Sequence, residues 1–148
     1  MTLTPKDGLP LPQRYGAIAT IIIGISMAVL DGAIANVALP TIASDLNASP
    51  ASSIWIVNAY QIAIVISLLS FSFLGDMFGY RRVYQCGLVV FTLTSLFCAL
   101  SDTLHTLTLA RIIQGFGGAA LMSVNTALIR LIYPQRHLGR GMGINSFI

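Results

Sequence analysis

Hydrophobic residues are concentrated in four long runs along the chain, and most polar residues lie between those runs. An α-helix rises about 1.5 Å per residue, so roughly 20 apolar residues cross a hydrocarbon core about 30 Å thick. Each run is long enough for that crossing. The pattern therefore predicts four membrane-spanning helices, at about residues 15–39, 54–74, 83–100 and 107–132.

The segments at the two ends have a different pattern. Residues 1–14 contain three prolines and precede the first run, which predicts a short N-terminal tail. After Pro134 the chain is basic and then turns apolar again, so a fifth span is predicted to begin near residue 142. We expect the chain to be a piece of a longer protein, because four spans and a stub leave polar residues inside the membrane without their partners.

Composition excludes a soluble globule as the leading interpretation. Hydrophobic residues make up 55% of the chain and charged residues 9%, with a mean hydropathy of +0.81. This leaves too little polar surface to face water on all sides. The alternatives are buried core helices of a large soluble protein and a cleaved signal peptide ending near Ala35. Four successive long runs favour an all-α, polytopic bundle of transmembrane helices instead.

The basic residues predict topology rather than a nucleic-acid partner, although the net charge is +3. The loops around residues 40–53 and 101–106 contain no Lys or Arg, whereas basic residues flank the other ends of the runs. By the positive-inside rule the N-terminus is cytoplasmic. The flanking basic residues are Lys6, Arg14, Arg81, Arg82, Arg130, Arg136 and Arg140.

Two charges lie inside the predicted spans. Asp31 is roughly 13 Å of helix before Pro40, and Arg111 is within about two helical turns of the outer end of the fourth run, so their depths match. Intramembrane charges are costly and are functional candidates by default. We expect both side chains to face one wet cavity and to influence each other's charge state. The alternatives are a purely structural Asp31 and an Arg111 that reaches the outer headgroups.

Other polar and small residues in the runs are open to two interpretations each. Polar side chains there either line a substrate path or make hydrogen bonds between helices. Cys86 and Cys98 are expected to be small packing residues, and the glycines of residues 115–120 are expected to let the fourth helix approach its neighbours closely. We find no spacing typical of a metal site, a cofactor loop or a catalytic set, so no enzyme is predicted. The possible substrate-path residues are Asn36, Asn58, Gln61, Gln114 and Asn125.

Three segments resemble motifs of the major facilitator superfamily. Residues 72–82 resemble its loop signature between helices two and three, with Asp76, Gly79 and Arg81 in place, whereas Met77 and Tyr80 stand where the family has basic residues. Residues 30–40 and 109–119 are similar to the first-helix and fourth-helix motifs of the drug:proton antiporters, especially those with fourteen spans (EmrB/QacA type).

The resemblance implies a major facilitator fold, in which residues 15–148 form part of an N-terminal six-helix bundle and helix four is the counterpart of helix one. It implies drug:proton antiport by alternating access, with Asp31 and Arg111 in proton coupling. Asp76, Gly79 and Arg81 would form a cytoplasmic gating loop. The implied partners are lipophilic or cationic small molecules, protons, lipid and the remaining helices, with no cofactor. The implied location is the bacterial inner membrane.

Two other functions are compatible with the sequence. One is a facilitator-fold transporter of an ordinary metabolite, and the other is a truncated membrane protein that does not transport. The fifth-helix antiporter motif, which would separate export from metabolite transport, would begin beyond Ile148.

Overall fold

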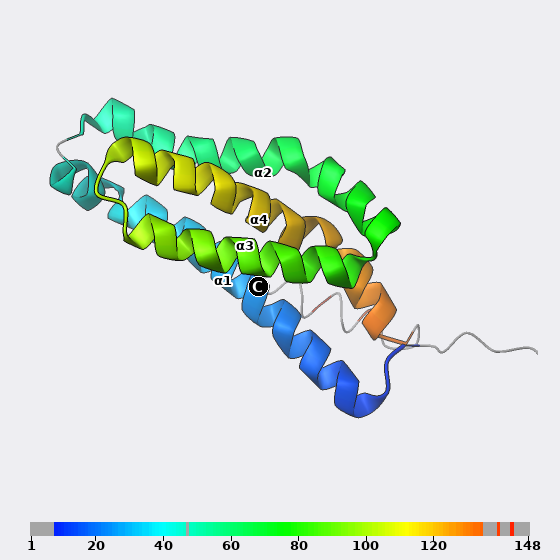
Figure 1. Ribbon diagram of the computed structural model, residues 1–148. Coiled ribbons are helices and arrows are strands. Elements are labelled where there is room, and N and C mark those ends of the chain that lie inside the picture. The colour runs from blue at the N-terminus through cyan, green and yellow to red at the C-terminus, as the bar shows by residue number, and fades with distance from the viewer. Residues whose placement is uncertain (1–7, 47, 135–138, 140–142, 144–148) are drawn as a thin grey trace, which may run out of the picture.

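The computed structural model describes residues 8–46, 48–134, 139 and 143, and this part of the chain forms four long helices and no strand (Figure 1). All four helices are long and apolar enough to cross a membrane, so the predicted all-α bundle is confirmed. The predicted fifth span, near residue 142, lies almost wholly outside the described residues. The helices are α1 (Leu11–Asp45), α2 (Pro50–Phe78), α3 (Tyr80–Ala99) and α4 (Leu104–Ile132).

The helices extend beyond the predicted spans at several ends. α1 begins at Leu11, inside the predicted tail, and continues through Pro40 to Asp45. A proline removes one backbone hydrogen bond, and membrane helices tolerate that loss when neighbouring groups compensate. α2 begins at Pro50, where the fixed φ of proline suits a first helical position, and the hydroxyl of Ser49 caps it. Which part of each helix lies within lipid stays a prediction.

A single glycine makes the reversal between α2 and α3. Gly79 has a φ of 93°, a left-handed value that side chains with a Cβ rarely adopt. Its N–H donates to the carbonyl of Gly75 at 3.0 Å and its carbonyl accepts from the N–H of Arg82 at 3.1 Å, so the same residue ends one helix and begins the next. The sequence predicted a tight turn over residues 75–82, and the structure contracts the turn to one residue.

α4 lies between α2 and α3 at the centre of the bundle (Figure 1). Its glycines allow this position, because a Cβ at Gly115 would lie 2.7 Å from the carbonyl oxygen of Tyr60 on α2. On the opposite side, a Cβ at Gly117 would lie 2.8 Å from the backbone nitrogen of Phe91 on α3. The predicted close approach of the fourth helix to its neighbours is therefore confirmed, and it involves both flanking helices.

The outside of the bundle is apolar. Val37 of α1 and Leu69 of α2 are each 82% exposed, and Val65 is 71% exposed. In water such a surface would be unfavourable by about 25 cal/mol for each Å² of apolar area. Lipid tails remove this penalty, so the exterior fits a protein surrounded by acyl chains.

Contacts at one end of the bundle hold the start of α1 to the other helices. The N–H of Leu9 donates to the carbonyl of Ile132 at the end of α4, at 3.1 Å. The guanidinium of Arg14 donates to the carbonyl of Leu9, and the hydroxyl of Tyr84 on α3 donates to the carbonyl of Thr20 on α1. The two ends of the four-helix segment therefore lie on the same side, as an even number of crossings requires.

We predict that Gly117→Ala destabilises the bundle, because the new Cβ would press against the backbone of α3. Overpacking of this kind costs about 1–3 kcal/mol. The thermal unfolding temperature in detergent should fall, whereas Gly16→Ala should leave it unchanged or raise it, since a Cβ at Gly16 meets nothing within 4 Å. Equal unfolding temperatures for the two variants would contradict the proposed α3–α4 packing.

Candidate functional site

Asp31 lies on the buried stripe of α1. Ile21, Ile25, Ala28 and Ala35 are buried and follow one another at helical spacing, and Asp31 falls three residues after Ala28 on the same face. Residues three and four apart share a helix face. The pattern that packs α1 against the bundle therefore also turns the carboxylate inward.

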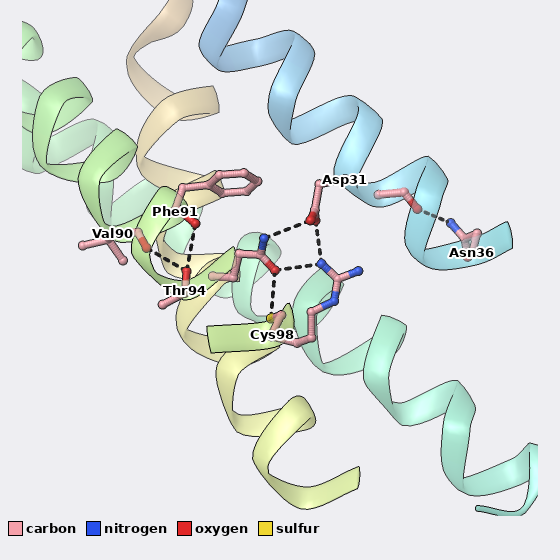
Figure 2. Close-up of polar contacts among 9 residues, drawn as sticks. Asp31, Asn36, Val90, Phe91, Thr94 and Cys98 are labelled. Atoms are coloured by element: carbon pink, nitrogen blue, oxygen red, sulfur yellow. Dashed lines mark hydrogen bonds and ion pairs between the residues drawn. The ribbon is translucent and has the colours of Figure 1, made fainter. Parts of the chain in front are cut away.

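Arg111 of α4 binds this carboxylate directly. Its Nη1 lies 2.5 Å from Oδ2 of Asp31, and the two side chains are 6% and 21% exposed (Figure 2). Water screens such a pair only weakly, so each charge depends on the other. Removing one partner of a fully buried pair costs about 3–5 kcal/mol, and the cost is lower here because Asp31 is partly exposed to the adjoining cavity. The predicted proximity of the two charges is thus present in the structure, whereas their role in proton coupling stays a prediction.

Gln114 closes a ring of hydrogen bonds with the pair. Its Oε1 accepts from Nη1 of Arg111 at 2.7 Å, and its Nε2 donates to Oδ1 of Asp31 at 3.0 Å. The side chain has no exposed surface. Gln114 sits one helical turn after Arg111, so α4 presents both groups to α1 from one face. The amide fixes the orientation of the pair, because it satisfies one group on each partner.

Tyr60 of α2 supplies an aromatic face to the same guanidinium. The Cζ of Arg111 lies 5.0 Å from the centre of the Tyr60 ring, a distance at which a cation is attracted to the ring face. Tyr60 is 4% exposed, and its hydroxyl has no hydrogen-bond partner among the described residues. The ring rather than the hydroxyl therefore accounts for the interaction with Arg111.

Cys98 extends the network to α3. Its Sγ lies 3.6 Å from Oε1 of Gln114, within hydrogen-bond distance for a thiol donor (Figure 2). Cys86, twelve residues earlier on the same helix, is exposed on the outside of the bundle. Cys98 therefore packs within the bundle and also contacts the polar site, whereas Cys86 does not pack inside the described bundle.

A cavity of about 370 Å³ adjoins the ion pair. Asp31 and Arg111 line its inner end, and Asp45, Leu46 and Ser101 line the other end, where α1 and α3 finish. Side chains from all four helices contribute to its wall. The cavity therefore leads from the buried charges to the end of the bundle that the charge pattern predicts to be outside.

At the opposite end of the bundle, Asp76 contacts a tyrosine. Its carboxylate accepts a hydrogen bond from the hydroxyl of Tyr80, one residue beyond Gly79. Within the described ranges the structure records no ion pair between Asp76 and Arg81, and both side chains are exposed. Tyr80 stands where the resembled motif has a basic residue, and a neutral phenol here takes the acidic partner. The gating role of Asp76, Gly79 and Arg81 stays a prediction.

The other polar residues named from the sequence do not line this cavity. Asn36, Asn58 and Gln61 are exposed on the outside of the bundle, and the amide of Asn36 donates to the carbonyl of Gly32 in its own helix. Asn125 is buried within α4. A substrate path along these residues stays a prediction. Within the part of the chain that the structure describes, no three His, Cys, Asp or Glu side chains are grouped to hold a metal ion.

Comparison with known proteins assigns the chain to a family. The sequence profile of the Major Facilitator Superfamily matches residues 21–148, which is most of the chain and includes both charges of the site. The chain belongs to the major facilitator superfamily. Its helices therefore form part of a major facilitator fold, and it is a multi-pass membrane protein of a transporter family.

Relatives of this facilitator chain carry different names. It is 89% identical over its whole length to "Uncharacterized transporter YebQ" of Escherichia coli K12, and 34% identical over 93% of its length to "Riboflavin transporter RibZ" of Clostridioides difficile. It is also 34% identical over 97% of its length to a "Tetracenomycin C resistance and export protein" of Streptomyces glaucescens. The chain spans 32%, 30% and 26% of these relatives.

Sequence reasoning missed Tyr60 and Cys98 as members of the site. A partial signal exists for Tyr60, because Ile56, Ala63 and Ser67 repeat at helical spacing and mark its face of α2 as buried. No comparable pattern indicates that this face meets Arg111. Contacts between helices depend on how each helix is rotated about its axis, and apolar runs surrounded by lipid specify that rotation weakly.

We predict that Asp31 and Arg111 are strongly coupled in stability. Asp31→Asn and Arg111→Met should each lower the unfolding temperature in detergent, because each leaves the other charge buried without its partner. The double variant should lose less than the sum, with a coupling energy of about 0.5–3 kcal/mol. Strictly additive effects in this double-mutant cycle would mean that the pair does not persist in the folded protein.

We predict opposite outcomes for two substitutions of Tyr60. Tyr60→Phe keeps the ring over Arg111 and removes a buried hydroxyl without a described partner, so stability should be unchanged or higher. Tyr60→Leu removes the ring face and should cost about 0.5–2 kcal/mol of cation–π stabilisation. Both are measured by thermal unfolding in detergent, and a larger loss in Tyr60→Phe than in Tyr60→Leu would refute the assigned role of the ring.

Proposed function

We propose that the chain is the N-terminal part of a proton-coupled exporter of lipophilic or cationic compounds, with Asp31 as the proton-carrying group. The observation that carries the proposal is the buried contact between Asp31 and Arg111. A carboxylate inside a membrane bundle is energetically costly unless it is paired or hydrated, and such a residue is by default a functional candidate. Here it is paired with a cation and also borders a cavity.

The coupling follows from the charge balance of the site. Arginine stays protonated, so only Asp31 can change its charge. When Asp31 takes up a proton, its ionic attraction to Arg111 is lost, while the guanidinium keeps the amide oxygen of Gln114 and the ring of Tyr60 as partners. α1 is then held to α4 less tightly. A change in helix packing can therefore be linked to proton uptake, because the two charge states favour different arrangements.

Names among the relatives support the export direction. One relative is an export protein for tetracenomycin C, and another, 39% identical over 78% of the chain, is "Putative multidrug resistance protein MdtD" of Salmonella paratyphi B. We further propose that the protein lies in the bacterial inner membrane with a cytoplasmic N-terminus. In this orientation the loop with Asp76, Gly79 and Arg81 faces the cytoplasm and gates that side.

Transport of an ordinary metabolite is the second candidate function. The observation in its favour is the relative named as a riboflavin transporter. The same charge pair would serve proton-coupled uptake as well as export, because it sets the coupling ion and not the substrate. The two candidates therefore differ in the substrate and in whether it moves with the proton or against it.

We predict that Asp31→Asn abolishes substrate-driven proton movement. A chimera in which this chain replaces the matching third of the Escherichia coli relative would be reconstituted in vesicles that contain a pH-sensitive dye. Ethidium addition should drive proton release in the wild-type chimera. Release should fall to the level of empty vesicles in Asp31→Asn, since the amide cannot exchange a proton, and should be strongly reduced in Arg111→Ala. Asp102→Asn, which changes an exposed carboxylate outside the cavity, is the control.

Two results would change this interpretation. Wild-type proton release in both Asp31→Asn and Arg111→Ala would exclude the proposed coupling. Proton movement with riboflavin and none with lipophilic cations would favour the metabolite transporter.

A further inference from the structure

Packing of α1 against the bundle is concentrated in the segment before Asp31. Ile21, Ile25 and Ala28 are buried and belong to the hydrophobic cluster that α1 shares with the other helices. Of the described residues of α1 after Asp31, none belongs to that cluster and only Ala35 is buried. The two segments of α1 are therefore attached differently, because apolar packing holds the first and the contact with α4 at Asp31 holds the second.

Tyr84 of α3 binds the backbone of α1 within the packed segment. Its hydroxyl donates to the carbonyl of Thr20 at 3.1 Å and lies 3.3 Å from the carbonyl of Ile21, and the side chain is buried. Within the described ranges, these are the hydrogen bonds recorded between α1 and α3. Hydrogen bonds are directional, so this contact restricts how α1 rotates and slides against α3 more than apolar packing does.

Gly24 makes room for the Tyr84 hydroxyl on the surface of α1. A Cβ at this position would overlap that hydroxyl and would lie 3.1 Å from the Cζ of the same ring. A side chain here would therefore push Tyr84 away from the carbonyls that it binds. The contact thus needs a tyrosine on one helix and a glycine on the other.

The Tyr84 contact does not involve the charge of Asp31. A phenol and a peptide carbonyl are both neutral, and Asp31 lies ten residues after Ile21, about 15 Å along the helix. Leaving a buried hydroxyl without a partner is unfavourable, so Tyr84 has reason to stay bound when the ion pair weakens.

We propose that Tyr84, seated on Gly24, is the pivot of α1. It holds the segment before Asp31 to α3 in both charge states of that carboxyl, so neutralising Asp31 tilts α1 away from α4 instead of releasing the whole helix. Tyr84 is then a positioning residue, which acts on Asp31 through α1. The role of the proton rests on the proposed function, whereas the pivot can be tested with Asp31→Asn, which removes the charge without any transport.

The place of the pivot sets the size of the movement. Asp31 lies seven residues after Gly24, about 10 Å of helix, and Ser44 lies twenty residues after it, about 30 Å. All of these residues belong to one continuous helix. A tilt about Gly24 therefore moves Ser44 about three times as far as Asp31, whereas Ala19, five residues before the pivot, moves about a quarter as far as Ser44.

The test measures two distances within the four-helix unit of the full-length chimera, by double electron–electron resonance between spin labels. All native cysteines are replaced by serine. Labels at Ser44→Cys and His105→Cys report the end of α1 beyond the pivot, and labels at Ala19→Cys and Thr126→Cys report the segment before it. All four positions are exposed, and each pair joins α1 to α4.

Asp31→Asn should lengthen the Ser44–His105 distance and change the Ala19–Thr126 distance by about a quarter as much or less. A rigid rotation of the whole unit changes neither distance. Two unchanged distances, or two distances that change equally, would therefore overturn the pivot.

Tyr84→Phe separates a pivot from ordinary apolar packing. In the Asp31→Asn background it should let the Ala19–Thr126 distance change as well, because α1 has then lost both polar attachments. Tyr15→Phe, which removes an exposed hydroxyl from the same helix, is the control and should leave that distance as it is in Asp31→Asn alone. An unchanged distance in Asp31→Asn/Tyr84→Phe would show that apolar packing alone holds this segment, and would overturn the role of Tyr84.

Gly24→Ala tests the seat of the hydroxyl. It should lower the unfolding temperature in detergent, and adding Tyr84→Phe should restore much of the loss, because the oxygen that the new Cβ overlaps is then gone. Gly16→Ala, where a Cβ meets nothing within 4 Å, is the matched control and should show no such rescue. If Gly24→Ala does not fold, folding of Gly24→Ala/Tyr84→Phe supports the contact, and failure of this double variant to gain stability or fold overturns it.

The pivot and the proposed function fail separately. If Asp31→Asn changes the two distances as expected and still gives wild-type proton release with ethidium, the pivot stands and the proposed function fails. If proton release is lost and the two distances change equally, the coupling stands and the pivot fails.

Discussion

The contact between Asp31 and Arg111 is the interaction on which the polar site inside the bundle depends. A bundle surrounded by lipid gains little from bringing apolar helices together, because acyl chains are as apolar as leucine side chains. Two opposite charges at one depth do favour association of their helices, because neither charge can face lipid and each compensates the other. At 2.5 Å between Nη1 and Oδ2, the pair joins α1, which otherwise lies at the edge, to the central helix α4. The ring of hydrogen bonds through Gln114 then fixes one orientation of the two side chains.

The glycines of α4 make this arrangement possible. Gly115 brings the backbone of α2 close enough for the Tyr60 ring to cover the guanidinium, and Gly117 brings α3 close enough for Cys98 to reach Gln114. Small residues thus do more than increase packing, because they place an aromatic face and a thiol beside a buried charge. The same few glycine positions on α4 therefore determine both the packing between the helices and the arrangement of the polar site.

The four helices and the central charge pair could be predicted from the sequence, whereas some helix ends and two residues of the site could not, for physical reasons. The four helices follow from run length, and the Asp31–Arg111 contact follows from matching depth and opposite charge. The spacing of Gln114 placed it beside Arg111. The predicted helix ends were less accurate. The sequence pattern predicted that the first helix ends at Pro40, but α1 continues past this proline to Asp45. Tyr60 and Cys98 were missed because their contacts depend on helix rotation, to which a uniformly apolar exterior contributes no signal.

The packed apolar core on one side of the charge pair and the cavity on the other suggest why the charges lie where they do. Deeper toward the chain's start, the core of Phe91, Leu121 and Val124 would leave a carboxylate without water in any charge state. Nearer the outer end, the carboxylate would be solvated, and its protonation would no longer affect the contact between α1 and α4. The pair lies at the boundary between packed core and cavity, and under the proposed coupling a proton taken up by Asp31 at this boundary also changes the strength of a helix contact. At this position the carboxylate borders the cavity and also takes part in the contact between α1 and α4. Neither the packed core nor the outer end of the bundle provides both conditions.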